Sequence, residues 1–456
     1  MARVWDFFAN EGDYPDFDAD GACERLARAL AIPTVDGPSR EETDWAAFDE
    51  LEGHMRSSFP TLFSMAEAEH VDHSLMLMLP GSEPDLRPML LLGHMDVVPV
   101  VPGTEADWTW GAFSGHLDEE YVWGRGAIDM TDQLMGNLEA LEYLLSHGGR
   151  LRRTVIVCMG QDEETTQEGA RAMGQELLRR GVRAEFSLDE GGYLVSNLGR
   201  LGAPGRHGLM VYLAEKGYAD VRLTVRSAGG HSSNPFGGTS LATLARAIAR
   251  VVENGWPSEM TDLTRQMLEA TGGCTDVDPE VLRADRELFP YVTTTIAPDI
   301  ITGSSSQANV MPQDMTATIN FRLLEGTTCA DVLERVRTLV ADLPVEVKLI
   351  EEVSNDPSHV SVLDGVAREA LEDACGRYFR EPATGEALPL VPSLLLGASD
   401  SRMYECVCDA CLRFSPFVAD DEEVERGVHG TDERITRRAY AQGIRFLIRV
   451  LENACR

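Results

Sequence analysis

Two residues near the end of an apolar run could act together in metal chemistry. His94 and Asp96 lie in the strand-like segment 89–98, and the single residue between them would place both side chains on one face of an extended chain. A carboxylate beside a metal-bound imidazole commonly accepts the second ring N–H, which fixes the tautomer and raises the basicity of the ligand. We therefore expect Asp96 to support His94 at a metal site. For this pair alone, a capping aspartate beside a solvated histidine is the alternative.

A pair of adjacent glutamates follows the next apolar run, over residues 154–164. Glu163 and Glu164 would point to opposite sides of an extended backbone, so they are expected to have different tasks. One carboxylate can bind an ion while its neighbour accepts and delivers protons. Taken alone, such an acidic run is more typical of a solvated turn or the start of a helix.

Further acids and a second histidine occur at comparable places. Asp129 lies in the turn-like segment WGRGAIDM, Asp189 and Glu190 end the apolar run 184–191, and His429 precedes the last helical segment. Carboxylates gathered in one pocket without a cation would repel each other, at a cost of several kcal/mol. Carboxylates with two histidines form a ligand set suited to zinc, manganese or cobalt, so the pattern predicts an open hydrolytic metal site.

The elements that must position these residues are strands alternating with helices. The three apolar runs have no helical period, whereas the segment 132–149 between two of them carries leucines on one helical stripe. This alternation predicts an α/β fold with a mostly parallel, doubly wound sheet. In such sheets the reactive crevice lies at the carboxyl ends of the strands, which is where the acids occur.

A second pattern begins at about residue 208. It contains two helical segments and four strand-like segments in the order β-α-β-β-α-β, which is that of a ferredoxin-like module; they are expected at 209–227, 240–254, 291–298, 309–324, 329–343 and 345–350. Helical periodicity then resumes and ends in a long terminal helix predicted from Thr431. We therefore predict a discontinuous catalytic domain, residues 1–207 and 353–456, with an inserted α+β lid or dimerisation domain, residues 208–352.

Composition excludes several classes of partner. The chain has 456 residues, and 40 Lys plus Arg against 75 Asp plus Glu give a formal net charge of −35. Such a surface repels phosphate backbones and anionic membranes, so neither nucleic acid nor membrane is expected as a partner. The first residues lack the pattern of a secretory signal, and nine cysteines are an odd number that fits a reducing cytoplasm better than a disulfide framework.

Eight short motifs occur in the order found in a known family. They are GHMDVVP, WGRGAIDM, DEE, LDEGG, AGGHSSNP, NVMP with NFR, GASDSR and VHGTDERI. Over nearly its whole length the chain resembles the dinuclear-zinc family of aminoacylase, glutamate carboxypeptidase and acetylornithine deacetylase. The segment HMDVVPVVPGTEADWTWGAFSGHL is most similar to the carboxypeptidase S branch, whose members cleave peptides or N-acyl amino acids with a free carboxylate.

This resemblance implies a role for each candidate residue of the metal site. It implies two divalent ions, zinc first, with cobalt or manganese as alternatives. The implied roles are His94 and Asp189 on one ion, Glu164 and His429 on the other, Asp129 bridging both, Asp96 supporting His94, and Glu163 as general base. The family commonly has a cis peptide bond after the bridging aspartate, so the same is expected between Asp129 and Met130.

The resemblance also implies roles for residues that touch the substrate. His231 in the inserted domain would stabilise the oxyanion, often from the partner subunit, which implies a homodimer through that domain. Arg402 and Asn309 match positions that hold the substrate carboxylate or backbone. After the bridging aspartate the family usually continues with Lys-Gly, whereas here Met130 is followed by Thr131 and Asp132, which leaves substrate preference open.

The expected reaction is hydrolysis of an amide or peptide bond in a substrate with a free carboxylate, either a short peptide or an N-acyl amino acid. Two alternatives stay open at this point. One is a biosynthetic deacetylase or desuccinylase, which would differ only in its pocket. The other is a catalytically silent binding protein on the same fold, and the intact base and ligand positions argue against it.

Overall fold

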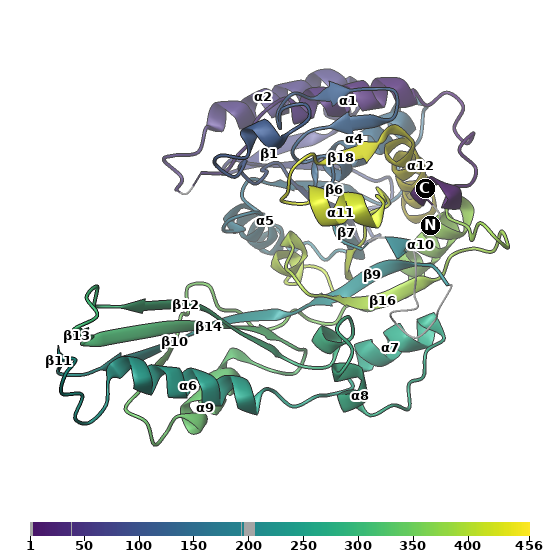
Figure 1. Ribbon diagram of the computed structural model, residues 1–456. Helices are drawn as coiled ribbons and strands as arrows, with labels where there is room; N and C mark the ends of the chain where they lie inside the picture. The colour runs from purple at the N-terminus through teal and green to yellow at the C-terminus, as the bar shows by residue number, and fades with distance from the viewer. Residues whose placement is uncertain (1–2, 38, 193, 196–205) are drawn as a thin grey trace.

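The computed structural model describes residues 3–37, 39–192, 194–195 and 206–456. In these residues, a nine-stranded sheet forms the larger part of the molecule and a four-stranded sheet forms a second part that projects from it (Figure 1). The predicted α/β fold with an inserted α+β module is confirmed.

The large sheet is parallel at its centre. Strands β6, β3, β7 and β17 run parallel to one another, whereas β9 and β16 are parallel to each other and antiparallel to β17. The strand order is β1 (Glu67–Val71), β2 (Ser74–Leu79), β6 (Val155–Gly160), β3 (Met89–His94), β7 (Phe186–Asp189), β17 (Cys411–Arg413), β9 (Gly208–Glu215) and β16 (Leu390–Leu395), with β8 (Leu194–Val195) paired to β9.

Helices cover both faces of this sheet, which explains why its central strands are buried at every position. On β3, Leu91 packs into the core on one face, while Leu90 and Leu92 pack into the core on the other. The first face is covered by α1 (Ala19–Leu30), α4 (Thr131–Ser146), α10 (Gly365–Tyr378) and α12 (Arg437–Cys455), and the second by α5 (Glu168–Arg179) with the 3₁₀ helix η5 (Asp400–Tyr404).

The four-stranded sheet has its own core and the predicted ferredoxin-like order. The strands lie in the order β15, β10, β14, β12, and α6 and α9 pack on them. Their bounds are β10 (Gly217–Arg226), α6 (Ser240–Asn254), β12 (Thr295–Gly303), β14 (Asp314–Leu323), α9 (Cys329–Leu339) and β15 (Glu346–Leu349). A small ribbon, β11 (Gly230–His231) with β13 (Val310–Met311), lies at the far end of this part (Figure 1).

The remaining elements are short or peripheral. Helices α7 (Asp262–Thr271) and α8 (Pro279–Arg283) pack beside β9 and β16, and among the described residues no helix has both the length and the apolar character needed to cross a membrane. The others are α2 (Trp45–Ser58), α3 (Pro60–Met65), α11 (Asp421–Gly427), β4 (His116–Leu117), β5 (Tyr121–Trp123), β18 (Arg434–Thr436), and the 3₁₀ helices η1 (Val4–Phe7), η2 (Glu105–Asp107) and η4 (Phe289–Tyr291).

Several predicted elements have different bounds in the structure. The strand expected over 291–298 is β12, and the one expected over 309–324 is divided into β13 and β14. The single strand expected over 209–227 is interrupted at Lys216, so that β9 joins the large sheet and β10 joins the small one. The terminal helix begins at Arg437 rather than near Thr431, because the preceding residues form β18 against β5 and Thr436 caps the helix. The predicted domain limits stay a prediction; residues 196–205, just before the limit at 207/208, lie outside the described residues.

Candidate metal and active site

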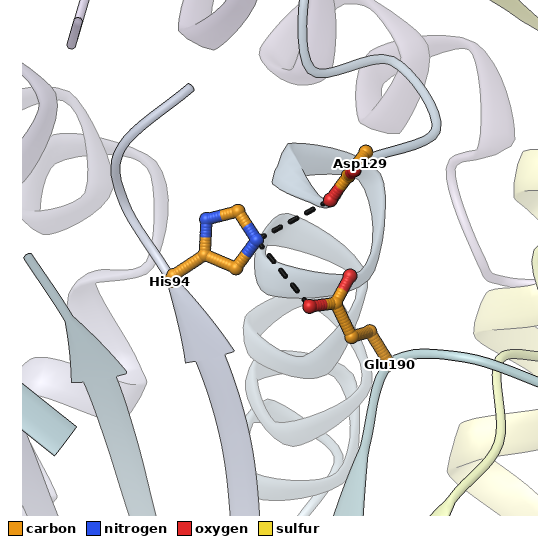
Figure 2. Close-up of side chains that lie close together, drawn as sticks. All are labelled: His94, Asp129 and Glu190. Atoms are coloured by element: carbon orange, nitrogen blue, oxygen red, sulfur yellow. Dashed lines mark ion pairs between the residues drawn. The ribbon is translucent and has the colours of Figure 1, made fainter. Parts of the chain in front are cut away.

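Three side chains from separate elements meet at the carboxyl edge of the large sheet (Figure 2). His94 ends β3, Asp129 lies in the loop before α4, and Glu190 directly follows β7. The Nε2 atom of His94 lies 3.4 Å from Asp129 Oδ1 and 3.5 Å from Glu190 Oε1. Their potential ligand atoms all lie within 4.8 Å of one another.

A second group shares Asp129 with the first. His429 Nε2 lies 3.1 Å from Asp129 Oδ2 and 3.1 Å from Glu164 Oε2. Each oxygen of Asp129 therefore faces a different histidine. The peptide bond between Asp129 and Met130 is cis, as predicted.

Asp96 lies behind His94 and also reaches the two glutamates after β6. Its Oδ1 is 3.3 Å from His94 Nδ1, and the same ring nitrogen is 2.9 Å from the Asp96 carbonyl oxygen. The two carboxylate oxygens accept hydrogen bonds from the backbone N–H groups of Glu163 and Glu164, at 3.1 and 3.0 Å. Asp96 thus links the histidine at the end of β3 to the acidic pair that follows β6.

The electrostatics of the site are those of acids crowded into a buried pocket. Burial raises the pKa of Asp129, but hydrogen bonds with His429 and His94 outweigh this effect and hold its pKa below the ordinary range. Hydrogen bonds with Asp129 and with Glu164 raise the pKa of His429 to about 10. Burial, and then the charges of Glu190 and Asp129, raise the pKa of Glu163.

The residues present fit bound divalent cations. Among the described residues, the buried atoms His94 Nε2 and Glu164 Oε1 have no hydrogen-bond partner, although each lies in one of the two groups. Leaving such polar atoms unpaired in a buried site is costly. Imidazole nitrogens and carboxylate oxygens are ligands for zinc and similar ions, and a cation at each group would also offset the repulsion between the acids.

A cavity of about 320 Å³ opens onto these groups. Glu163 lines it, and Gln167 Nε2 donates a 3.0 Å hydrogen bond to Glu163 Oε1. Its lining includes the acids Asp129, Glu163, Glu164 and Glu190 together with His429, Tyr212, Ser399 and Ser415. Most of the other lining side chains are apolar, among them Ile128, Leu395, Phe417, Ala419, Val424 and Val428. The cavity therefore joins a charged reaction centre to a hydrophobic compartment.

Asp189, the ligand expected at the first ion, lies outside both groups. Glu190 occupies the place beside His94 instead. Asp189 is the last residue of β7, its carboxylate is fully buried, and its register partner on β17 is Arg413, whose charge opposes the effect of burial on its pKa. Which of the two adjacent acids faces His94 depends on a strand-end alternation that the sequence leaves undetermined. A ligand role for Asp189, whose two carboxylate oxygens are buried without a hydrogen-bond partner among the described residues, stays a prediction.

Three other predicted residues lie outside the two groups and do not line the cavity. His231 and Asn309 lie at the far end of the small sheet, where Ser232 N donates to Asn309 O at 3.0 Å and the side chain of His231 is exposed. Arg402 does not line the cavity. Its guanidinium donates to Asn355 Oδ1 and to the Asp356 carbonyl oxygen, both at 2.6 Å, near the return from the small sheet.

Comparison with protein families gives one match over most of the chain. The model of peptidase family M20/M25/M40 matches residues 90–453. Among curated proteins, an N-fatty-acyl-amino acid synthase/hydrolase from Xenopus tropicalis is 32% identical over 94% of this chain and 85% of its own length. A probable carboxypeptidase S-like protein from Dictyostelium discoideum is 30% identical over 94% of this chain and 84% of its own.

Solved structures show the same fold at lower identity. An M20 family metallo-carboxypeptidase from Sulfolobus solfataricus superposes with a TM-score of 0.69 at 18% identity, covering 94% of this chain and 98% of that one. The di-peptidase Dug1p from Saccharomyces cerevisiae gives a TM-score of 0.63 at 14% identity, covering 95% and 96% of the two chains.

Proposed function

Because the chain belongs to peptidase family M20/M25/M40 and is a metal-dependent hydrolase of amide or peptide bonds, we propose that it cleaves N-acyl amino acids with an apolar acyl group and a free carboxylate. The observation that carries this proposal is the cavity whose lining combines the acids of the candidate metal site with a majority of apolar side chains among the other residues. Short peptides with an apolar first residue present similar chemistry and are the second candidate, in line with the carboxypeptidase S-like relative.

The apolar wall favours a hydrophobic group over an acetyl or succinyl group. Each buried methylene contributes about 0.8 kcal/mol to binding, so a chain of several carbons gains substantially from this compartment. A succinyl carboxylate would instead lie next to Phe417 and Val424, with the acids of the site nearby. This argues against the biosynthetic desuccinylase. The relative from Xenopus tropicalis, an N-fatty-acyl-amino acid synthase/hydrolase, supports the same class.

The proposed metal ligands are the two groups of side chains that share Asp129. His94 and Glu190 would hold one divalent ion and Glu164 and His429 the other, with Asp129 between them; zinc is the ion we propose, and cobalt or manganese would fit the same ligands. Bound there, the ions would supply Lewis acidity and lower the pKa of water. Glu190 thus takes the place that sequence reasoning assigned to Asp189.

Glu163 is the proposed general base. Its carboxylate lines the cavity, and its raised pKa suits a group that must both accept and release a proton. It would take a proton from the attacking water and pass it to the nitrogen of the leaving amino acid as the amide bond breaks. Asp96 would hold this base in place through the backbone N–H of Glu163 and would orient His94 at the same time.

His231, Asn309 and Arg402 are the proposed substrate contacts outside the metal cluster. His231 and Asn309 lie side by side at the tip of the small sheet, so one movement or one partner subunit would deliver both. His231 would stabilise the oxyanion. Arg402 would bind the substrate carboxylate after exchanging its contacts with Asn355 and Asp356.

The proposed assembly is a homodimer through the small sheet. Strand β12 is one of its two edge strands, and the described residues place no strand on its outer side. Large apolar side chains are exposed on β12 and nearby, including Ile300, Ile301, Val310 and Phe236, the last 96% exposed. We also propose a cytoplasmic location, because all nine cysteines are free.

A substrate panel tests the proposed reaction. The purified protein would be assayed with added zinc, manganese or cobalt on dipeptides, N-acetyl amino acids, an N-succinyl amino acid and N-acyl amino acids of increasing chain length. We expect kcat/KM to rise with acyl length, and Glu163→Gln to retain metal while losing at least about a hundredfold in kcat. Preference for N-acetyl or N-succinyl substrates would overturn the assignment in favour of a biosynthetic deacylase.

A further inference from the structure

One buried carboxylate joins the two loops that carry Asp129 and His429. Glu433 is fully buried, directly before β18. Its Oε1 accepts hydrogen bonds from the backbone N–H groups of Ile128 and Asp129, at 2.8 and 3.1 Å. Its Oε2 accepts from the backbone N–H of Gly126 at 3.0 Å and from Arg125 Nη1 at 2.7 Å. The loop before α4 is thus folded around the side chain of Glu433.

Arg125 extends the same contact to the histidine loop. This guanidinium is almost fully buried. Its Nη2 donates a 2.7 Å hydrogen bond to the carbonyl oxygen of Gly430, the residue after His429. Gly430 itself has no room for a side chain, because an added Cβ would lie 1.9 Å from the Arg426 carbonyl oxygen. The Arg125–Glu433 pair therefore connects two segments about three hundred residues apart in sequence, each carrying one side chain of the second group.

The chemistry of the contact requires a carboxylate. Four N–H donors converge on two oxygens, and an ionised carboxylate can accept all of them, whereas an amide has only one acceptor oxygen and adds two donors. Burial raises the pKa of Glu433 to about 7, while the charge of Arg125 and the backbone N–H groups act in the opposite direction. Replacing the carboxylate would leave buried N–H groups unpaired, which is more costly than losing an exposed hydrogen bond.

We propose that Glu433 is a positioning residue that, together with Arg125, fixes the separation of Asp129 and His429 and so builds the second metal-binding group. Neither residue reaches the cavity, so the role is exerted through the loops. The inference rests on the proposed function only in taking Asp129, Glu164 and His429 as metal ligands. It is independent of which substrate is cleaved.

The test measures cobalt binding rather than turnover. Co²⁺ would be titrated into the metal-free protein, and the d–d absorption would report the geometry of each bound ion. His429→Ala identifies the ion held by the second group. We expect Glu433→Gln to lower the affinity for that same ion by about tenfold or more and to change its absorption spectrum.

Glu139→Gln is the matched control. Glu139 is also a buried glutamate that binds an arginine, Arg25, at 2.6 and 2.9 Å, but it lies on α4 outside both ligand groups. This variant should melt at a lower temperature yet bind both cobalt ions as the wild type does. A loss of affinity in both variants would show that general destabilisation is responsible and would overturn the positioning role.

Arg125→Lys keeps the test decisive if Glu433→Gln does not fold. It retains the carboxylate and the backbone hydrogen bonds that the loop before α4 donates to it, but a lysine ammonium cannot reproduce the guanidinium fork that donates to both Glu433 and Gly430. We expect the second group to bind Co²⁺ with an affinity several-fold lower than in the wild type. Wild-type cobalt affinity and spectra in both variants would exclude the proposal, whereas a wild-type protein that binds two ions but cleaves nothing in the panel would overturn the proposed substrate alone.

Discussion

Adjacent acids at the end of β7 have different surroundings, and this difference can be tested. Glu190→Gln and Asp189→Asn each remove one negative charge at neighbouring positions. Because only Glu190 lies beside His94, we expect Glu190→Gln to weaken metal at the first group by about tenfold or more. Asp189→Asn should retain both ions. Metal content after dialysis, measured by mass spectrometry, distinguishes the variants, and the reverse pattern would restore Asp189 as the ligand.

Residue types indicated a metal site, and the resemblance to a metal-dependent family selected most of the residues of the cluster. The ligands that it implied include His94, Asp129, Glu164 and His429, and these four side chains do lie together. The choice within the Asp189 and Glu190 pair depends on where β7 ends and how the following glycines turn. Local sequence does not determine that geometry.

The contact that Glu433 makes between two distant loops could not be predicted from the sequence, for a different reason. The role proposed for Glu433 depends on four donors contributed by the segment 125–129. No periodicity or spacing in the sequence links those residues to position 433. In the sequence, a glutamate flanked by charged residues predicts an ordinary solvated turn. Its burial and its hydrogen-bond partners depend on the tertiary fold.

Helices α4 and α12, which cover one face of the large sheet, each have a glycine where they contact the ring of Phe417, a residue that lines the cavity. Phe417 lies between Gly136 of α4 and Gly443 of α12, and a Cβ added to Gly443 would lie 2.4 Å from the ring. We expect Gly443→Ala to lower the free energy of unfolding by about 1–3 kcal/mol, because the ring must move within a packed core. Urea unfolding followed by circular dichroism would measure this loss.

Gly376→Ala provides the matched control in helix α10. An added Cβ there would meet only the Cβ of Ala387, at 3.5 Å, which is an ordinary contact. Since alanine favours helix more than glycine, this variant should be unchanged or more stable by up to about 1 kcal/mol. Equal losses in both variants would mean that the helix backbone, and not the Phe417 ring, sets the requirement for glycine.

The order of elements was predictable, whereas their ends and sheet membership were less so. Alternation of apolar runs with helical stripes indicated the parallel sheet, because both faces of its strands are buried. The long strand-like stretch over 209–227 gave no sign that Lys216 would separate it into strands of two sheets. That break depends on tertiary contacts, including the hydrogen bond from Lys216 Nζ to the Thr293 carbonyl oxygen at 2.8 Å.

At the scale of the whole molecule, the two sheets have separate hydrophobic cores and separate shares of the proposed chemistry. The metal cluster belongs to the large sheet, while His231 lies on β11 at the far end of the small one (Figure 1). A residue so placed reaches a reaction centre only by a large closure of its own chain or from a second copy. The exposed apolar surface around β12 favours the second copy.

Complementation between two inactive variants distinguishes these routes. His231→Ala retains Glu163, and Glu163→Gln retains His231, so a mixed dimer contains one site with both groups only if His231 acts across the interface. Equal co-expression should restore about a quarter of wild-type activity, since about half of the dimers are mixed and each has one competent site of two. Light scattering would give the molar mass, expected at twice the 50.0 kDa of one chain. A monomeric mass, or no activity above that of the separate variants, would instead assign His231 to its own subunit or remove it from the reaction.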